Sequence, residues 1–230
     1  MKLFRRGAAL ILSLALLLSL VAVVATPNWK DTTSLGLLSR YYETGKTNTD
    51  QAAAGMISTV VGDPGGKSFG AAIDMEAEGR VFSFDIHANK LSLITNGAER
   101  LGLSKVIKAE KQDGRERLDA LSESADRVIC DVPCSGIGAI KGRPEIRYKD
   151  FSDLSSLIQT QRAIALNGFA YLKKGGVMVY STCTLNKQEN EDNVKFLLGT
   201  QKDAVLLEEE TVLPTVKHYD GFYIAKILKK

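Results

Sequence analysis

RVICDVPCSGIGAIKGRPEIRY, residues 127–148, joins a short apolar run to a polar loop that contains glycine and proline. The run VIC has the brevity of a buried parallel strand, and the loop DVPCSG at residues 131–136 consists largely of turn-forming residues. In open α/β sheets the ligand crevice lies beyond the carboxyl ends of the strands. We therefore expect Asp131 and Cys134 to lie at a sheet edge where chemistry takes place.

A second thiol occurs in a matching context. The apolar run GVMVY, residues 176–180, is followed by the polar turn STCT, which contains Cys183. Two strand ends would deliver Cys134 and Cys183 to the same rim. A reactive thiolate needs an accessible, polar setting, and both cysteines follow their strands into such a turn. Cys130 lies inside its apolar run and is interpreted as a core residue.

The cysteine pattern argues against two other kinds of site. Cys130 and Cys134 do not form a Cys-x-x-Cys pair, and the only histidines are His87 and His218, so a metal site is poorly supported. Because neither thiol has a histidine nearby in the sequence, the Cys-His arrangement of proteases is not visible.

Length and composition fit one full-sized domain, with or without appendages. The 230 residues include 44% hydrophobic residues, an ordinary share for a chain with a sizeable core. A formal net charge of +3 is too small to argue for nucleic acid by itself. Three widely spaced cysteines do not make a disulfide framework, which indicates a reducing compartment or thiols kept free for a reason.

The N-terminal segment differs from the rest of the chain. Basic residues precede an apolar run, residues 7–25, that only two serines interrupt. This pattern is typical of a secretory signal, and the run is close to the roughly 20 residues that span a bilayer. A buried core helix fits less well because the run has no polar face. We interpret residues 1–26 as a signal-like or membrane-anchor segment and residues 27–49 as a linker.

From residue 50 onward, apolar runs alternate with helical patterns. Strands are predicted at residues 60–61, 81–84, 106–109, 128–130, 176–180, 204–207 and 222–228, and helices at residues 51–58, 69–77, 88–101, 152–172 and 186–198. This alternation predicts an α/β fold with a Rossmann-like, doubly wound and mostly parallel sheet.

Three more polar positions follow predicted strands. The turn DPGGKS, residues 63–68, offers backbone N–H groups at a helix start, although a phosphate-binding P-loop would need glycine where Val61 stands. A plain tight turn is the alternative. Asp85 suits either the two hydroxyls of a ribose or the cap of the next helix. Asp113 is a similar candidate, and its alternative is a turn aspartate.

Basic residues cluster directly after the Cys134 loop. A solvated basic face is the usual explanation for such a run, but its position beside the expected site favours contact with a phosphate backbone. Tyr148 adds a stacking surface for a base. The cluster consists of Lys141, Arg143, Arg147 and Lys149.

These motifs resemble those of the RNA cytosine-C5 methyltransferases, most closely the bacterial Sun/Fmu (RsmB-like) group, which methylates small-subunit ribosomal RNA. DVPCSG followed by RPEI (residues 143–146) resembles one signature, and YSTCT (180–184) followed by ENE (189–191) resembles the nucleophile motif. PGGKS (64–68), FDIH (84–87) and DGFY (220–223) also fall in family order. Each motif is modest, but five in order are specific.

The resemblance implies a class I methyltransferase domain over residues 50–230, with S-adenosylmethionine as methyl donor. It implies that Cys183 attacks C6 of a cytosine so that C5 takes the methyl group, and that Cys134 helps to release the enzyme. Asp131 would contact the base and the cofactor region, and the base must be unstacked to enter. The resemblance also implies which residues hold each part of the cofactor. Asp85 would bind the ribose and Asp113 the adenine. The methionine part would be held by Pro64, Gly65, Gly66 and Lys67.

Two features depart from the family. In the family, the first strand leads through Cys-Ala-Ala directly into Pro-Gly-Gly-Lys, whereas residues 56–63 of this chain read MISTVVGD. The interval from Asp50 to Pro64 is also about one strand too short. We therefore expect a truncated first strand. In addition, a signal-like segment stands where the family has its N-terminal RNA-binding region.

We expect a monomeric enzyme of rRNA processing that makes 5-methylcytosine. We expect it in the cytoplasm, because its methyl donor is made inside cells. Its partner would be RNA, and no metal is expected. Membrane contact through residues 7–25 stays open. Two alternatives also stay open, a degenerate RNA-binding relic without activity and a secreted thiol protein.

Overall fold

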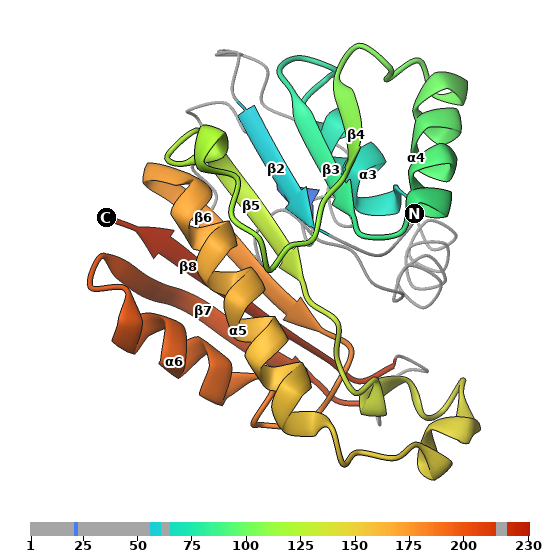
Figure 1. Cartoon of the computed structure of the whole chain (residues 1–230), viewed down its shortest axis with the longest axis vertical. Coiled ribbons are helices and arrows are strands. Elements are labelled where there is room, and N and C mark those ends of the chain that lie inside the picture. Colours follow the sequence, from blue (N-terminus) through green and yellow to red (C-terminus); the bar gives the residue numbers. More distant parts are fainter. Residues whose placement is uncertain (1–20, 23–55, 61–64, 215–219) are drawn as a thin grey trace, which may run out of the picture.

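The computed structural model describes residues 21–22, 56–60, 65–214 and 220–230 (Figure 1). The signal-like or anchor segment and the linker lie outside the described residues, apart from residues 21–22, and so does Pro64. Within the described part of the chain, no helix is both long and apolar enough to cross a membrane.

The strands form two hydrogen-bonded ladders. One has the order β2–β5–β6–β8–β7, and the other β1–β3–β4. Their bounds are β1 (Val21–Ala22), β2 (Met56–Val60), β3 (Val81–Asp85), β4 (Ile107–Lys111), β5 (Ala125–Asp131), β6 (Leu172–Thr182), β7 (Ala204–Val212) and β8 (Phe222–Lys229). The neighbouring pairs β2–β5, β5–β6 and β3–β4 are parallel, whereas β8 runs antiparallel to β6 and β7. The predicted mostly parallel sheet is confirmed.

Helices cover both faces of this sheet. They are α3 (Gly66–Asp74), α4 (Ala88–Arg100), α5 (Leu154–Tyr171) and α6 (Glu191–Thr200), with short 3-10 turns η1 (Asp119–Leu121), η2 (Ile137–Ala139) and η3 (Pro144–Tyr148). In Figure 1, α5 lies in front of β5 and β6, and α3 lies behind β3 and β4. Figure 1 also shows β2 between β5 and β3, so the two ladders form one doubly wound α/β layer.

The helix predicted over residues 51–58 is wrong for the part that the structure describes. Residues 56–60 form β2, which pairs in parallel with β5 from Met56 opposite Ala125 to Val60 opposite Cys130. The alanines before this segment suggested a helix, but its sequence MISTV is rich in β-branched residues, which favour a strand inside a sheet. Residues 51–55 lie outside the described part.

The ladder beside β2 is interrupted, but β2 itself shows no truncation among the described residues. With five residues, β2 is as long as β3 and β4. It bonds to β5 along its length, but the ladder partners of β3 are β1 and β4. The irregularity therefore lies between β2 and β3, at the centre of the sheet.

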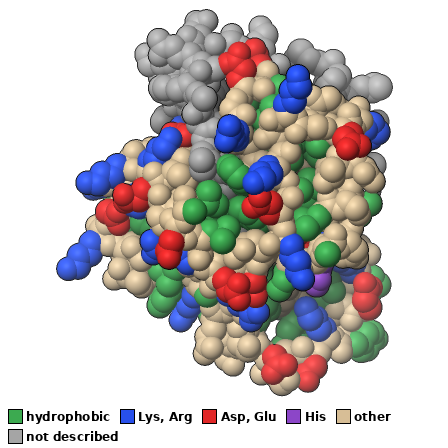
Figure 2. Space-filling model, turned by 45° about the horizontal axis from the view of Figure 1, so that its top comes forward, with side chains coloured by type: hydrophobic (Ala, Val, Ile, Leu, Met, Phe, Trp, Pro, Cys, Tyr) green, Lys and Arg blue, Asp and Glu red, His purple; other side chains and the backbone are tan. Residues whose placement is uncertain are grey.

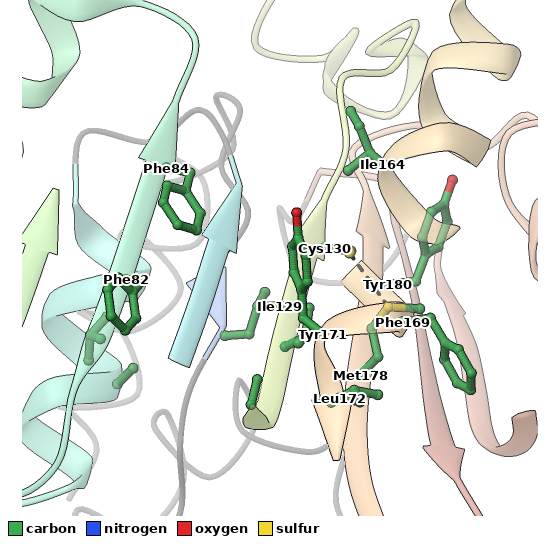
Figure 3. Close-up of a cluster of buried hydrophobic side chains, with 14 of the residues drawn as sticks. Phe82, Phe84, Ile129, Cys130, Ile164, Phe169, Tyr171, Leu172, Met178 and Tyr180 are labelled. Carbon is green, nitrogen blue, oxygen red and sulfur yellow. Dashed lines mark hydrogen bonds between the residues drawn. The ribbon is translucent and has the colours of Figure 1, made fainter. Parts of the chain in front are cut away.

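Close packing under α5 fixes β5 and β6. Cys130 is fully buried beside Met178, with its Sγ atom 3.5 Å from Met178 Sδ (Figure 3). Gly168 of α5 lies directly above them, where an added Cβ would be 2.5 Å from Cys130 Sγ. Burial also raises the pKa of the Cys130 thiol well above its usual value. Cys130 is thus an inert core residue, as the sequence predicts.

Candidate active site

The two loop cysteines meet where β5 and β6 end. The Sγ atoms of Cys134 and Cys183 lie 3.0 Å apart, and the Cys183 N–H donates a hydrogen bond to Cys134 Sγ at 3.3 Å. Both are free, partly buried thiols. Because β5 and β6 are adjacent parallel strands, with Asp131 opposite Ser181, their loops emerge side by side. The sequence analysis expected this meeting of strand ends.

The environment keeps Cys134 protonated. Its contact with the Cys183 sulfur is the largest effect that raises the pKa of Cys134 well above its usual value, and burial is the next. The nearby carboxylate of Glu189 adds to the increase, while the Cys183 N–H opposes it. Since two thiolates at this separation would repel each other, the pair carries at most one negative charge near neutral pH.

Backbone hydrogen bonds hold the three loops of this rim together. The Gly138 N–H donates to the carbonyl oxygen of Cys183 at 3.0 Å, and the Gly221 N–H donates to the carbonyl oxygen of Gly138 at 2.7 Å. A Cβ on Gly138 would lie 2.0 Å from the Gly221 oxygen and 2.8 Å from that of Cys183. Only glycine allows this approach, which explains why the turn before β8 belongs to the site.

Asp131 links the thiol rim to the glycine-rich turn. It ends β5, is almost fully buried, and its Oδ2 atom lies 2.8 Å from Lys67 Nζ in the first turn of α3. Its Oδ1 atom accepts a hydrogen bond from Ser181 Oγ at 3.0 Å. The structure thus brings together Lys67, Asp131 and the residues next to both cysteines.

The glycine-rich turn places backbone N–H groups at the start of α3. Gly65 precedes the helix with φ of 98°, a left-handed conformation that favours glycine. Gly66 is the exposed first residue of the helix. The first N–H groups of a helix have no partner within it and attract an anion or carboxylate.

Asp85 is completely buried at the end of β3. Its Oδ1 atom accepts the N–H of His87 at 2.8 Å, while the residue that caps α4 is His87. Its Oδ2 atom accepts no hydrogen bond, and Lys90 Nζ stands 3.5 Å away. Asp85 is therefore not the helix cap, although one of its oxygens binds the residue that is, and its other oxygen has Lys90 nearby but accepts no hydrogen bond.

Asp113 behaves as the turn aspartate of the alternative interpretation. Its Oδ1 atom accepts the N–H of Arg115 at 2.9 Å, and the guanidinium of Arg115 binds both carboxylate oxygens at 2.6–3.0 Å. The hydrogen bonds from Arg115 lower the pKa of Asp113. The structure places Asp113 beyond β4, on the same edge as Asp85, with its oxygens already engaged.

The basic cluster surrounds η3, directly after the Cys134 loop. Lys141, Arg147 and Lys149 are exposed, Arg143 is partly buried, and Tyr148 is 90% exposed. Lys149 Nζ donates to the carbonyl oxygen of Ser135 at 3.1 Å, which ties the cluster to the thiol loop. The face in Figure 2 mixes basic and acidic side chains around a hydrophobic area.

Sequence reasoning missed the network of buried polar side chains behind the thiols, although five of its members lie in the motifs DVPCSG, YSTCT and ENE. Its members are Ser135, Gln161, Tyr180, Thr184, Glu189, Asn190 and Asn193. One signal was present in the sequence, because Gln161 interrupts the apolar face of a predicted helix. This network also explains why α6 begins at Glu191 and not at residue 186, since the residues before it turn inward.

Comparison with known proteins gives one consistent result. Residues 50–228 match the family described as 16S rRNA methyltransferase RsmB/F. The probable ribosomal RNA small subunit methyltransferase B of Bacillus subtilis (strain 168) is 37% identical over 186 residues, which cover 73% of this chain and 41% of that protein. The ribosomal RNA small subunit methyltransferase B of Salmonella paratyphi A is 34% identical over 176 residues, which cover 73% of this chain and 40% of that protein.

Solved structures agree with this match. NSun6 from Pyrococcus horikoshii is 31% identical with a TM-score of 0.63, over 72% of this chain and 45% of that one. A methyltransferase homolog protein from Pyrococcus horikoshii is 26% identical with a TM-score of 0.63, over 73% of this chain and 59% of that one. This chain spans about two fifths of the length of the curated relatives it matches. The family match covers most of the chain, and the chain belongs to the RsmB/F family of 16S rRNA methyltransferases.

Proposed function

We propose that this chain transfers a methyl group from S-adenosylmethionine to C5 of a cytosine in RNA, through a covalent bond between Cys183 and the base. The observation that carries the proposal is the pair of thiols 3.0 Å apart at adjacent strand ends, in a chain of this family. Small-subunit ribosomal RNA is the proposed substrate because the curated relatives carry that name. The proposed compartment is the cytoplasm, where the methyl donor is made.

The residues around the glycine-rich turn fit S-adenosylmethionine. The buried Oδ2 atom of Asp85, which accepts no hydrogen bond, suits the hydroxyls of a ribose. The start of α3 suits a carboxylate, and Lys67 stands at the same place. When bound, S-adenosylmethionine supplies an electrophilic methyl group. One related structure, that of NSun6, contains the S-adenosylmethionine analogue SFG.

In the first half of the reaction, Cys183 is the nucleophile. The high pKa of Cys134 keeps a proton on its own sulfur, and Cys183 is the proposed source of the attacking thiolate. Its attack would form a sulfur–carbon bond at C6 and move an electron pair toward C5, which would take the methyl group as that group's bond to the sulfur of the donor breaks. The base reaches the thiol only if it is unstacked.

In the second half, Cys134 releases the product. Once Cys183 is bonded to carbon, its sulfur no longer carries a charge, and the largest effect that raised the pKa of Cys134 is gone. Cys134 then gives up its proton to water more readily, and its thiolate accepts the proton from C5. The Cys183–C6 bond breaks, the ring double bond returns, and the electron pair goes back to Cys183.

Asp131 and the basic cluster complete the proposed site. Asp131 lies between Lys67 and Ser181, from which its carboxylate can contact both the cofactor side and the base. The cluster Lys141, Arg143, Arg147 and Lys149 would hold the phosphates that flank the target base.

Methyl transfer to RNA tests the proposal directly. Labelled S-adenosylmethionine and undermethylated small-subunit ribosomal RNA should yield labelled 5-methylcytosine, and Cys183→Ala should abolish the label. Cys130→Ala is the matched control, because the loss of this core thiol should lower the free energy of unfolding by only about 1 kcal/mol. Label that survives in Cys183→Ala would contradict the proposed mechanism.

The break between β2 and β3 favours a second candidate, an RNA-binding relic that no longer binds the cofactor. Calorimetry with S-adenosylmethionine separates the two. Binding that weakens about tenfold or more in Asp85→Asn supports the enzyme, because hydrogen bonds to a buried carboxylate are lost. No binding of the cofactor, together with intact RNA binding, supports the relic.

A further inference from the structure

Glu189 is a fully buried carboxylate that the proposed reaction does not use. Its Oε2 atom accepts the Ser135 N–H at 2.8 Å and Gln161 Nε2 at 2.9 Å, and its Oε1 atom accepts the Ser135 hydroxyl at 2.5 Å. A buried charge is costly unless donors surround it. Three donors converge on this one, and two of them come from the residue next to Cys134.

The other neighbour of Cys134 is held by the same group. Gln161 Nε2, which donates to Glu189, also donates to the carbonyl oxygen of Pro133 at 2.8 Å. The backbone on both sides of Cys134 is therefore anchored, with Ser135 bound directly to Glu189 and Pro133 bound through Gln161. The sulfur of Cys134 contacts the sulfur and the backbone N–H of Cys183. Glu189 thus fixes the loop while it leaves the thiol free to face the other sulfur.

The frame behind Glu189 is rigid. Its carbonyl oxygen accepts the Tyr180 hydroxyl at 2.7 Å and Asn193 Nδ2 at 3.1 Å. Asn193 Nδ2 also donates to Gln161 Oε1 at 2.8 Å. Tyr180 belongs to β6 and Asn193 to α6, and both bind the backbone of Glu189, while Gln161 of α5 binds its side chain, so three elements hold this one residue. Satisfied buried networks of this kind hold one geometry.

We propose that Glu189 is a positioning residue, which holds the Cys134 loop against Cys183 and is needed to release the methylated base more than to attack it. This inference rests on the proposed function, since it assumes that Cys134 performs the release. The nucleophile keeps its place without Glu189, because Cys183 directly follows β6 and its carbonyl oxygen accepts the hydrogen bond from Gly138. The loop of the release thiol is also tied to Thr184 and Lys149 through Ser135, but Glu189 is the acceptor for both the N–H and the hydroxyl of Ser135.

Glutamine is the informative replacement for Glu189. It keeps the size of the side chain but removes the charge and turns one acceptor into an NH2 donor. If the NH2 group faces the Ser135 hydroxyl, that hydroxyl can turn its proton to Thr184 Oγ1 and accept; if it faces the Ser135 N–H and Gln161 Nε2, it meets two donors. In either case the hydrogen bonds to a charged acceptor are lost, so the Cys134 loop is held less firmly at its distance from Cys183.

Glu189→Gln should behave like Cys134→Ala. With RNA and S-adenosylmethionine it should form the covalent protein–RNA adduct and transfer about one methyl group per enzyme. Its turnover should be slower than that of the unchanged protein by a factor of about ten or more. Ser135→Ala, which removes only one donor, should do the same to a smaller degree. The control Gln188→Ala changes the exposed neighbour in the same turn and should leave turnover unchanged.

A second readout needs no RNA. Alkylation of Cys134 by iodoacetamide, followed by mass spectrometry, should occur at lower pH in Glu189→Gln, because both the carboxylate and the close Cys183 raise the pKa of this thiol. If Cys134→Ala fails to accumulate adduct while this alkylation shifts, the proposed function fails and the positioning role stands.

Three results would overturn the inference. The first is normal release of the product by Glu189→Gln with unchanged alkylation of Cys134. The second is equal loss of attack and release in a folded variant. If Glu189→Gln does not fold, Ser135→Ala decides the question, and release at the normal rate in that variant is the third.

Discussion

At the scale of single residues, Cys134 and Cys183 lie side by side beyond the ends of β5 and β6, and Asp131 ends β5 beside Ser181. Cys134, Cys183 and Asp131 were predictable because each follows an apolar run, and the ends of adjacent parallel strands meet. The partner of Asp131 is Lys67, 64 positions earlier (131 − 67), and no local pattern pairs them. Asp113 shows the reverse, since its carboxylate is bound by Arg115 only two positions away, as a turn residue would be.

The coupling between the thiols predicts a pH dependence. Cys183 is the main cause of the raised pKa of Cys134, so Cys183→Ala should lower that pKa toward the usual value. Alkylation of Cys134 should then begin at lower pH, because the reactive thiolate forms earlier. Mass spectrometry of alkylated peptides across a pH series checks this. Cys130→Ala should leave the profile of Cys134 unmoved, and an identical profile in Cys183→Ala would refute the coupling.

At the scale of elements, the sequence predicts most strands and helices but not their exact partners. Short apolar runs and glycine stops indicated β3, β5, α4 and α5 within a few residues of their observed bounds. β2 was mistaken for a helix, because its strand character depends on pairing with β5. The start of α6 was placed too early, because buried side chains, and not local propensity, set it.

Two helix glycines provide a matched test of packing. Gly168→Ala in α5 would place a Cβ 2.5 Å from Cys130 Sγ, whereas Gly199→Ala in α6 would meet nothing within 4 Å. Overpacking should therefore cost Gly168→Ala about 1–3 kcal/mol of unfolding free energy. Gly199→Ala should gain up to about 1 kcal/mol, since alanine favours a helix. Urea unfolding measures both, and equal effects would contradict the close contact of α5 with β5.

At the scale of the whole molecule, alternation along the chain predicts the doubly wound sheet, but not its strand order. Nothing in the local sequence of residues 222–229 indicates that β8 inserts antiparallel between β6 and β7. That placement brings Gly221 to the rim and joins it to Gly138. Side-chain networks that join three elements, such as the one around Glu189, are likewise visible only in the folded chain.

The basic cluster predicts a salt-dependent affinity for RNA. A double variant with Lys141→Ala and Arg147→Ala should bind RNA more weakly, and the slope of log K against log salt should fall by about 0.7 for each lost phosphate contact on a single strand. Its affinity for S-adenosylmethionine should stay the same. Lys202→Ala is the control, because this exposed residue precedes β7 at the opposite edge of the sheet. Filter binding across a salt series measures the slope, and an unchanged slope would exclude the cluster from the interface.

The division of labour between the two thiols is the central claim, and denaturing electrophoresis with labelled RNA tests it most directly. Cys134→Ala should attack and methylate the base and then remain bound to it, so that a protein–RNA band survives denaturation. Cys183→Ala should give no such band, because nothing attacks C6. An adduct that accumulates in Cys183→Ala, or in neither variant while both stay folded, would contradict the account.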